Sequence, residues 1–144
     1  MKKMTIYSPR LATLLLLSVF IISCSKKDAD PPAYADLIIG KWHIKKVSLD
    51  NGSIHFPAND CEKKTYYEFT KNKDFIAVSY EMSGSICKPQ IVSESPYNVL
   101  EDEKKILITD FTTNKTLEIV EVTKQKLSLY FPDAEATVFF EKDL

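Results

Sequence analysis

The chain reads Leu37-Ile38-Ile39-Gly40-Lys41-Trp42-His43-Ile44 at positions 37–44, and this stretch decides the fold. Within it, Trp42 and Ile44 alternate with His43 and with the lysines on either side. Alternation with a period of two is typical of a β-strand that buries one face. The apolar positions change parity at Lys45-Lys46, where we expect a β-bulge or a sharp bend. Only one turn of helix is expected, around 33–37.

Seven further stretches downstream have the composition of short strands, and turn signals separate them at intervals of about ten residues. The eight expected strands cover 37–49, 66–70, 76–82, 97–100, 106–109, 116–123, 127–131 and 137–141. Each is apolar on one face, and closing such a sheet into a barrel leaves no exposed edge. The pattern therefore predicts an all-β fold, namely an eight-stranded antiparallel up-and-down barrel. A β-sandwich is the alternative.

Gly40-Lys41-Trp42 resembles the Gly-x-Trp signature of lipocalins, and 37–44 is similar to the opening of lipocalin-like domains in bacterial lipoproteins. The resemblance extends over 33–144. It implies that Trp42 closes the bottom of the barrel and that Gly40 lets the chain pass close by. Lipocalins also pack a basic residue of the last strand on this Trp, and the sequence alone does not place that residue. The related domains often carry one Cys before the second strand and one after the third, as Cys61 and Cys87 stand here.

The N-terminus has the pattern of an export signal. Lys2, Lys3 and Arg10 precede an apolar run over 11–22, which is shorter than the roughly 20 residues of a membrane span. Ile21-Ile22-Ser23-Cys24 then resembles a lipobox, the site where lipoprotein signal peptidase cuts before a cysteine. We expect residues 1–23 to be removed and Cys24 to carry the lipid, as in lipoproteins of Gram-negative bacteria. An ordinary cleaved signal and an uncleaved anchor are the alternatives.

Residues 24–35 are polar, charged and proline-bearing, so we expect them to form a flexible tether to a lipocalin-like barrel domain over 36–144. Ser25 directly after the cysteine resembles lipoproteins that are sent to the outer membrane. The charged residues Lys26, Lys27, Asp28 and Asp30 loosely resemble signals for export to the cell surface. The expected location is therefore the outer membrane, at its periplasmic face or on the cell surface.

Composition narrows the class of function. Of the 19 Lys and Arg residues, three lie in the signal, so the rest of the chain has 16 basic and 20 acidic side chains. It contains no basic patch, which argues against nucleic acid as a partner. The chain has only three glycines and so no Gly-rich phosphate loop. His43 and His55 belong to no recognisable nucleophile motif, and the acidic run 101–103 reads as a solvated turn. We expect no enzymatic activity, no cofactor and no metal.

The cysteines are three in number, and Cys24 is assigned to the lipid. Cys61 and Cys87 then form an even pair in an oxidising compartment, which favours a disulfide. Two free thiols and a metal-binding pair are the alternatives.

Aromatic residues are the candidates for a binding site. An eight-stranded barrel is just wide enough to be filled by its own side chains or to hold one small ligand. The first hypothesis is a small apolar ligand. The alternative is a packed barrel that acts as a protein-interaction or structural lipoprotein, with a partner that the sequence does not name. The residues assigned to the ligand are Trp42, Tyr67, Phe69, Tyr80 and Phe131, and their alternative role is to fill the core.

Overall fold

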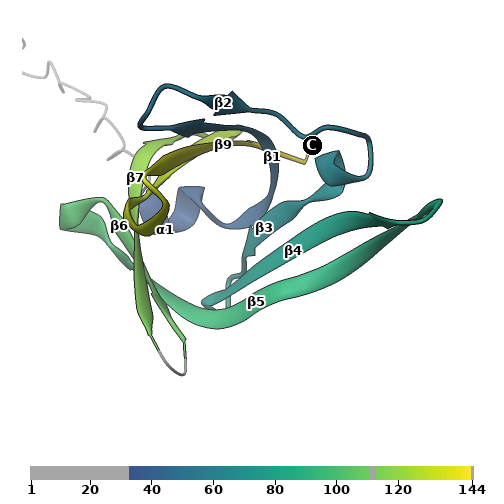
Figure 1. The fold of residues 1–144 in the computed structure, drawn as a ribbon. Coiled ribbons are helices and arrows are strands. Elements are labelled where there is room, and N and C mark those ends of the chain that lie inside the picture. Colours follow the sequence, from purple (N-terminus) through teal and green to yellow (C-terminus); the bar gives the residue numbers. More distant parts are fainter. Residues whose placement is uncertain (1–32, 111–112, 144) are drawn as a thin grey trace, which may run out of the picture. The chain divides into compact units, whose positions relative to one another are not determined.

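The structure is a computed structural model, and it describes residues 33–110 and 113–143. A short helix is followed by nine antiparallel strands in one sheet (Figure 1). The elements are α1 (Tyr34–Leu37), β1 (Gly40–Leu49), β2 (Ile54–His55), η1 (Glu62–Lys64), β3 (Tyr66–Phe69), β4 (Asp74–Ser83), β5 (Ile86–Leu100), η2 (Glu101–Glu103), β6 (Lys105–Thr109), β7 (Asn114–Val122), β8 (Lys126–Phe131), η3 (Pro132–Ala134) and β9 (Ala136–Lys142).

The sheet closes into a barrel because β1 also pairs with β9, from Trp42–Lys142 to Leu49–Ala136. Without β2, the barrel has eight strands, each paired with its neighbours in chain order, so the prediction of an up-and-down barrel is confirmed. The expected irregularity at Lys45-Lys46 is also present, since the β1–β9 register shifts between Ile44 and Lys46. Residues Pro31–Leu144 form one compact unit, and all strand pairing lies within it.

Strand β5 differs most from expectation, because it begins at Ile86 where the sequence predicted a strand only over 97–100. Its first part pairs with β4 alone, and its pairing with β6 begins at Tyr97. Pro89 and Pro96 weaken the strand signal, but a strand with one free edge tolerates proline. The β4–β5 hairpin extends beyond the rest of the barrel (Figure 1). The short strand β2 was also not predicted.

One end of the barrel is closed by Trp42, whose side chain is 0% exposed. Its indole Nε1 donates a hydrogen bond to the carbonyl of Ile38 at 2.6 Å. The ammonium of Lys142 lies 4.8 Å from the centre of the Trp42 ring and also donates to the carbonyl of Ile39. Lys142 in β9 is therefore the basic residue of the last strand that the sequence did not place. The plug joins the first and last strands.

Helix α1 lies at this same closed end, which is the far end in the view of Figure 1. The carboxylate of Glu101 accepts hydrogen bonds from the backbone N–H groups of Tyr34 and Ala35, at 2.9 and 2.8 Å. These two bonds satisfy N–H groups of the first turn, which have no partner within the helix. The helix is thus fixed to the loop after β5.

Gly40 passes directly beside the Lys142 side chain. Its φ of +134° favours glycine, and a Cβ built on it would overlap the Cε of Lys142. The lipocalin resemblance implies a close passage of the chain at this glycine, and the neighbour that the structure places there is the end of the Lys142 side chain.

We predict that Gly40→Ala lowers the free energy of unfolding of residues 31–144 by about 2–3 kcal/mol, measured by urea titration, through backbone strain and displacement of Lys142. Gly84→Ala is the control. Gly84 also has positive φ, +64°, but nothing lies within 4 Å of its Cβ position, so its cost is backbone strain of about 1 kcal/mol. Equal losses for the two variants would contradict the close approach.

Candidate functional site

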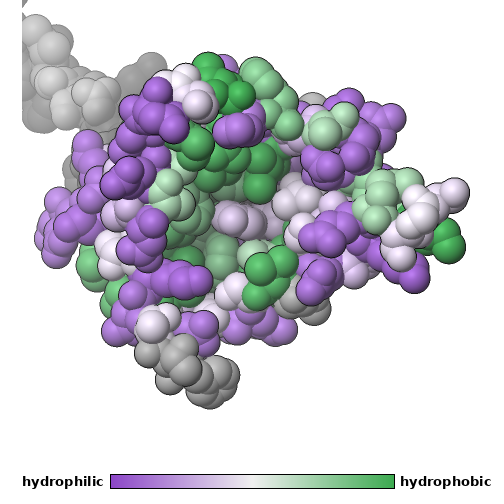
Figure 2. Space-filling model, viewed as in Figure 1, coloured by the Kyte–Doolittle hydropathy of each residue, from purple (hydrophilic) through white to green (hydrophobic). Residues whose placement is uncertain are grey.

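A cavity of about 330 Å³ lies at the end of the barrel opposite the Trp42 plug. Figure 2 shows this face, where hydrophobic residues gather in a central hollow and hydrophilic residues surround it. The walls come from strands β3 to β8 and from η3. The residues that line the cavity include Tyr67, Phe75, Ala77, Ser93, Thr116 and Phe131.

The cavity exists because large side chains are followed by small ones around the barrel. Cross-strand pairing places Trp42 opposite Tyr67, Tyr67 opposite Ala77, and Ala77 opposite Ser93. Directly opposed residues of an antiparallel pair lie on the same face of the sheet. Trp42 and Tyr67 fill their part of the interior, whereas Ala77 and Ser93 leave theirs open.

A second cavity of about 430 Å³ adjoins the first and shares Tyr67, Ala77 and Val92 with it. It lies along the seam between β1 and β4. β1 pairs with β3 only over Gly40–His43, and farther along the same edge it pairs with β2 instead. Because β3 is short, the C-terminal part of β4 has no strand beside it on that edge. The loop that carries η1 covers this seam.

Tyr67 is the side chain around which the first cavity is arranged. Its ring contacts Phe75, Phe131 and Phe140, with ring centres 5.2, 6.2 and 5.2 Å away. Its hydroxyl makes no hydrogen bond with any described residue. No fully enclosed side-chain polar atom in the described part lacks a partner, so this hydroxyl is accessible, and Tyr67 lines both cavities. Burial raises the pKa of Tyr67 above its usual value, so the group remains a protonated donor at neutral pH.

Besides Tyr67, the hydroxyl-bearing residues that line the cavity are Ser93 and Thr116. The hydroxyl oxygens of Ser93 and Ser95 lie 3.4 Å apart, and Ser95 is buried. The charged residues at the cavity are Asp110, Lys115 and Asp133, and all three are exposed. The interior of the cavity is therefore apolar with a few uncharged hydroxyl groups.

The structure separates the five residues that the sequence assigned to a ligand. Tyr67 and Phe131 line the same cavity, as the hypothesis requires. Tyr80 lines a different hollow, beside Phe56. Trp42 and Phe69 are 0% exposed and belong to the core, because the plug and the aromatic rings around Phe69 enclose them. They offer no surface to a ligand.

Sequence reasoning missed Ala77 and Ser93, which create the space. Ala77 carries no signal of its own, and Ser93 lies in the part of β5 that was not predicted. A regular extension of β5 back to Ile86 would have placed Val92 opposite Ala77, and the register shift between Ala77 and Val78 brings Ser93 there instead. The glycine-free run through 85–100 was the available signal.

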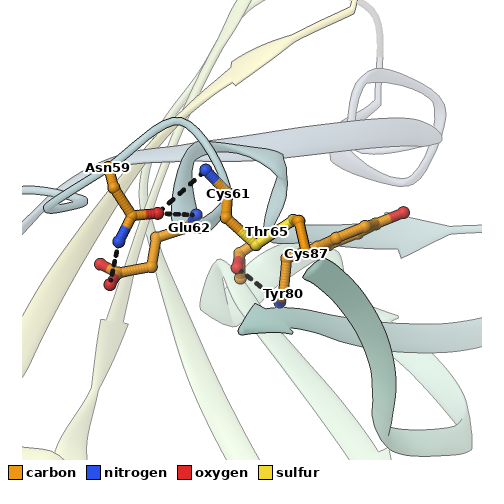
Figure 3. The surroundings of a disulfide bond; sticks show 6 residues. All are labelled: Asn59, Cys61, Glu62, Thr65, Tyr80 and Cys87. Carbon is orange, nitrogen blue, oxygen red and sulfur yellow. Dashed lines mark hydrogen bonds between the residues drawn. A yellow bond between two sulfur atoms is a disulfide. The ribbon is translucent and has the colours of Figure 1, made fainter. Parts of the chain in front are cut away.

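Cys61 and Cys87 form a disulfide with their Cα atoms 5.6 Å apart, so the predicted pairing is confirmed. The bond ties the loop before η1 to the start of β5 (Figure 3). Next to it, the Tyr80 N–H donates to the Thr65 hydroxyl at 3.0 Å, which attaches the end of the same loop to β4.

The loop before η1 is also ordered from within. The side-chain oxygen of Asn59 accepts hydrogen bonds from the N–H groups of Cys61 and Glu62, at 2.9 and 3.0 Å (Figure 3). The Glu62 carboxylate reaches back to the N–H of Ala58 at 2.8 Å and to the amide of Asn59 at 2.9 Å. This reciprocal arrangement resembles a capping box. The loop is thus held over the seam by local bonds as well as by the disulfide.

Among 33–110 and 113–143, no helix has the length and apolar character needed to cross a membrane. Within the same residues, no three His, Cys, Asp or Glu side chains are grouped as a metal site would require.

An up-and-down barrel closed by a tryptophan at one end and hollow at the other defines a lipocalin-like protein. The model of the lipocalin-like domain family matches residues 38–129, and the chain belongs to this family. The crystal structure of a lipocalin-like protein from Bacteroides uniformis has the same fold, with a TM-score of 0.54 and 16% sequence identity over 74% of this chain and 98% of that one. The comparison with curated proteins gave no match.

We predict that replacing both Cys61 and Cys87 by Ser lowers the free energy of unfolding by about 3 kcal/mol. The reason is that the bond joins two cysteines that are 26 positions apart in the sequence and so restricts the unfolded chain. Urea titration of residues 31–144 measures the change. Reduction of the unaltered domain by dithiothreitol is the control and should give the same loss. A double variant as stable as the unaltered domain would contradict a structural disulfide.

Proposed function

We propose that this chain is a lipoprotein anchored in the outer membrane, and that its lipocalin-like barrel binds a small apolar ligand. The cavity beside Tyr67 carries the proposal. Its volume of about 330 Å³ lies in the range of roughly 300–1,000 Å³ that is usual for small-molecule sites. Apolar walls with a few placed polar groups are also typical of such sites.

The alternative of a barrel packed solid is disfavoured by the same cavity. A role in contacting a partner protein keeps one supporting observation: Ile54 in β2 and Phe56 just after it are 52% and 68% exposed. Contiguous exposed apolar patches mark interaction sites, whereas single exposed apolar residues are common on protein surfaces. We give ligand binding priority because the cavity is enclosed on several sides, whereas these two residues lie on the surface.

The anchor rests on the sequence alone, since 1–23, Cys24 and most of the tether 24–35 lie outside the described residues. The lipobox resemblance at Ile21-Ile22-Ser23-Cys24 supports it. A lipoprotein cysteine carries two or three acyl chains, and each buried methylene contributes about 0.8 kcal/mol to membrane binding. Such an anchor would hold the barrel at the membrane whichever face of it is used. The periplasmic face and the cell surface are both compatible with this arrangement.

A role in binding without catalysis is part of the proposal. His43 pairs with Asp143 at 3.0 Å on the outside of the barrel, away from the cavity, and His55 is exposed. Among the described residues that line the cavity there is no histidine and no cysteine. The hydroxyl groups of Ser93 and Ser95 contact each other and no histidine.

We predict that residues 31–144 bind the uncharged fluorophore N-phenyl-1-naphthylamine, seen as an increase in its emission, and that Ser93→Phe reduces the affinity at least about tenfold by filling the cavity. Glu94→Phe is the matched control, because it adds the same ring on the exposed face of β5. Thermal unfolding confirms that both variants fold. No binding by the unaltered domain, or equal binding by both variants, would refute a ligand site in this cavity.

We predict that the full chain, produced in a Gram-negative host with labelled palmitate, incorporates the label and sediments with the outer membrane. Cys24→Ala should incorporate none, because the thiol that carries the lipid is gone. The variant lacking Cys61 and Cys87 is the control and should remain labelled. Label in Cys24→Ala would refute the assignment of this cysteine.

A further inference from the structure

We propose that Tyr67 determines the specificity of the cavity: its hydroxyl donates a hydrogen bond to the ligand, and the site selects uncharged apolar molecules that carry an acceptor such as an ester or ketone carbonyl. This inference rests on the proposed function, and it names the class of ligand that the cavity takes. The position of the Tyr67 ring, the state of its hydroxyl and the charges around the cavity support this selectivity.

The ring of Tyr67 is held in place from several sides. Phe75 meets it edge to face, and Phe131 and Phe140 pack against other parts of it. Tyr67 also forms a wall shared by the two adjoining cavities, so that its side chain borders both. A ring fixed in this way presents its hydroxyl in one direction before any ligand arrives, and such preorganisation lowers the entropic cost of binding.

The hydroxyl of Tyr67 differs from those of Tyr97 and Tyr130, which are paired within the barrel. The Tyr97 hydroxyl donates to the carbonyl of Thr70 at 3.0 Å, and the Tyr130 hydroxyl donates to the carboxylate of Asp50 at 2.8 Å. The Tyr67 hydroxyl has no such partner among the described residues. An apolar ligand that displaces water from the cavity would leave this donor unpaired, whereas a ligand with an acceptor would satisfy it. The cavity therefore favours a molecule with one acceptor along an apolar body.

The charges around the cavities disfavour an anion. Asp110 and Asp133 at the first cavity outnumber Lys115, and Glu81 borders the second. All four are exposed, so the described residues that line the two cavities place no cation in the interior that could pair with a carboxylate. A carboxylate drawn into apolar walls loses its hydration without a compensating partner. The raised pKa of Tyr67 also keeps its hydroxyl neutral.

The test uses competitors that share one chain length. N-phenyl-1-naphthylamine is bound to residues 31–144 and displaced by methyl laurate or by laurate. We expect methyl laurate to bind at least about tenfold more tightly than laurate. In Tyr67→Phe, methyl laurate should lose about tenfold in affinity, as one lost hydrogen bond would cause, while the fluorophore, which has no carbonyl to pair with the hydroxyl, keeps or gains affinity. Tyr80→Phe is the matched control and should leave both affinities unchanged.

The outcomes separate this inference from the proposed function. Absence of fluorophore and ester binding by the unaltered domain would overturn both. Fluorophore and ester binding that Tyr67→Phe leaves unchanged would overturn the role of Tyr67 and leave the ligand cavity standing. Laurate bound as tightly as its ester would overturn the selection against anions. A parallel loss of fluorophore and ester affinity in Tyr67→Phe would show that the ring shapes the cavity and that the hydroxyl does not select the ligand.

Discussion

The contact of Lys142 with Trp42 is the interaction on which the rest of the structure depends. The ammonium lies over the indole at 4.8 Å and donates to the carbonyl of Ile39, so one side chain of the last strand is bound to the first. Gly40 suits this approach, because its φ of +134° favours glycine and the missing Cβ leaves room for the end of the Lys142 side chain. The barrel closes at the same place, where Trp42 and Lys142 are cross-strand neighbours. The plug therefore fixes both the closure of the sheet and the end that is filled.

The hollow at the other end follows from the sizes of the side chains that pair across neighbouring strands. Around the barrel the paired residues change from Trp42 and Tyr67 to Ala77 and Ser93, and the interior changes from filled to open. The departure of β1 from β3 after His43 opens a seam beside the same cavity. The loop around η1 covers that seam and is held there by the Cys61–Cys87 disulfide. A barrel of eight strands thus combines a rigid closed end with a cavity.

These features fit a binding protein that is held at a membrane by a lipid. The proposed anchor at Cys24 would leave the barrel free to use its cavity, and the cavity offers a fixed donor, Tyr67, within apolar walls. The acidic residues at its edge would exclude fatty acids and other anions in favour of neutral molecules. Function in this proposal depends on selection by desolvation: a ligand must replace water at one hydroxyl and bring no charge with it.

The sequence by itself determined the class of fold, the position of the plug and the disulfide. These predictions depend on local signals, namely the alternation in the strands, the Gly40-Lys41-Trp42 signature and an even pair of cysteines. Each signal can be recognised without knowledge of distant contacts. Lys142 and Ser93 were not found in this way. One is a single lysine among many, and the other lies in a proline-bearing strand with only one partner along its first part.

Only the tertiary structure decided which aromatic residues form a site. Trp42, Phe69 and Tyr67 have similar local patterns, but closure of the barrel buried the first two and left Tyr67 beside the small residues Ala77 and Ser93. The volume of a cavity depends on which side chains meet across strands that are far apart in sequence. The register that brings them together is set by the whole closed sheet, and no single segment of the chain contains it.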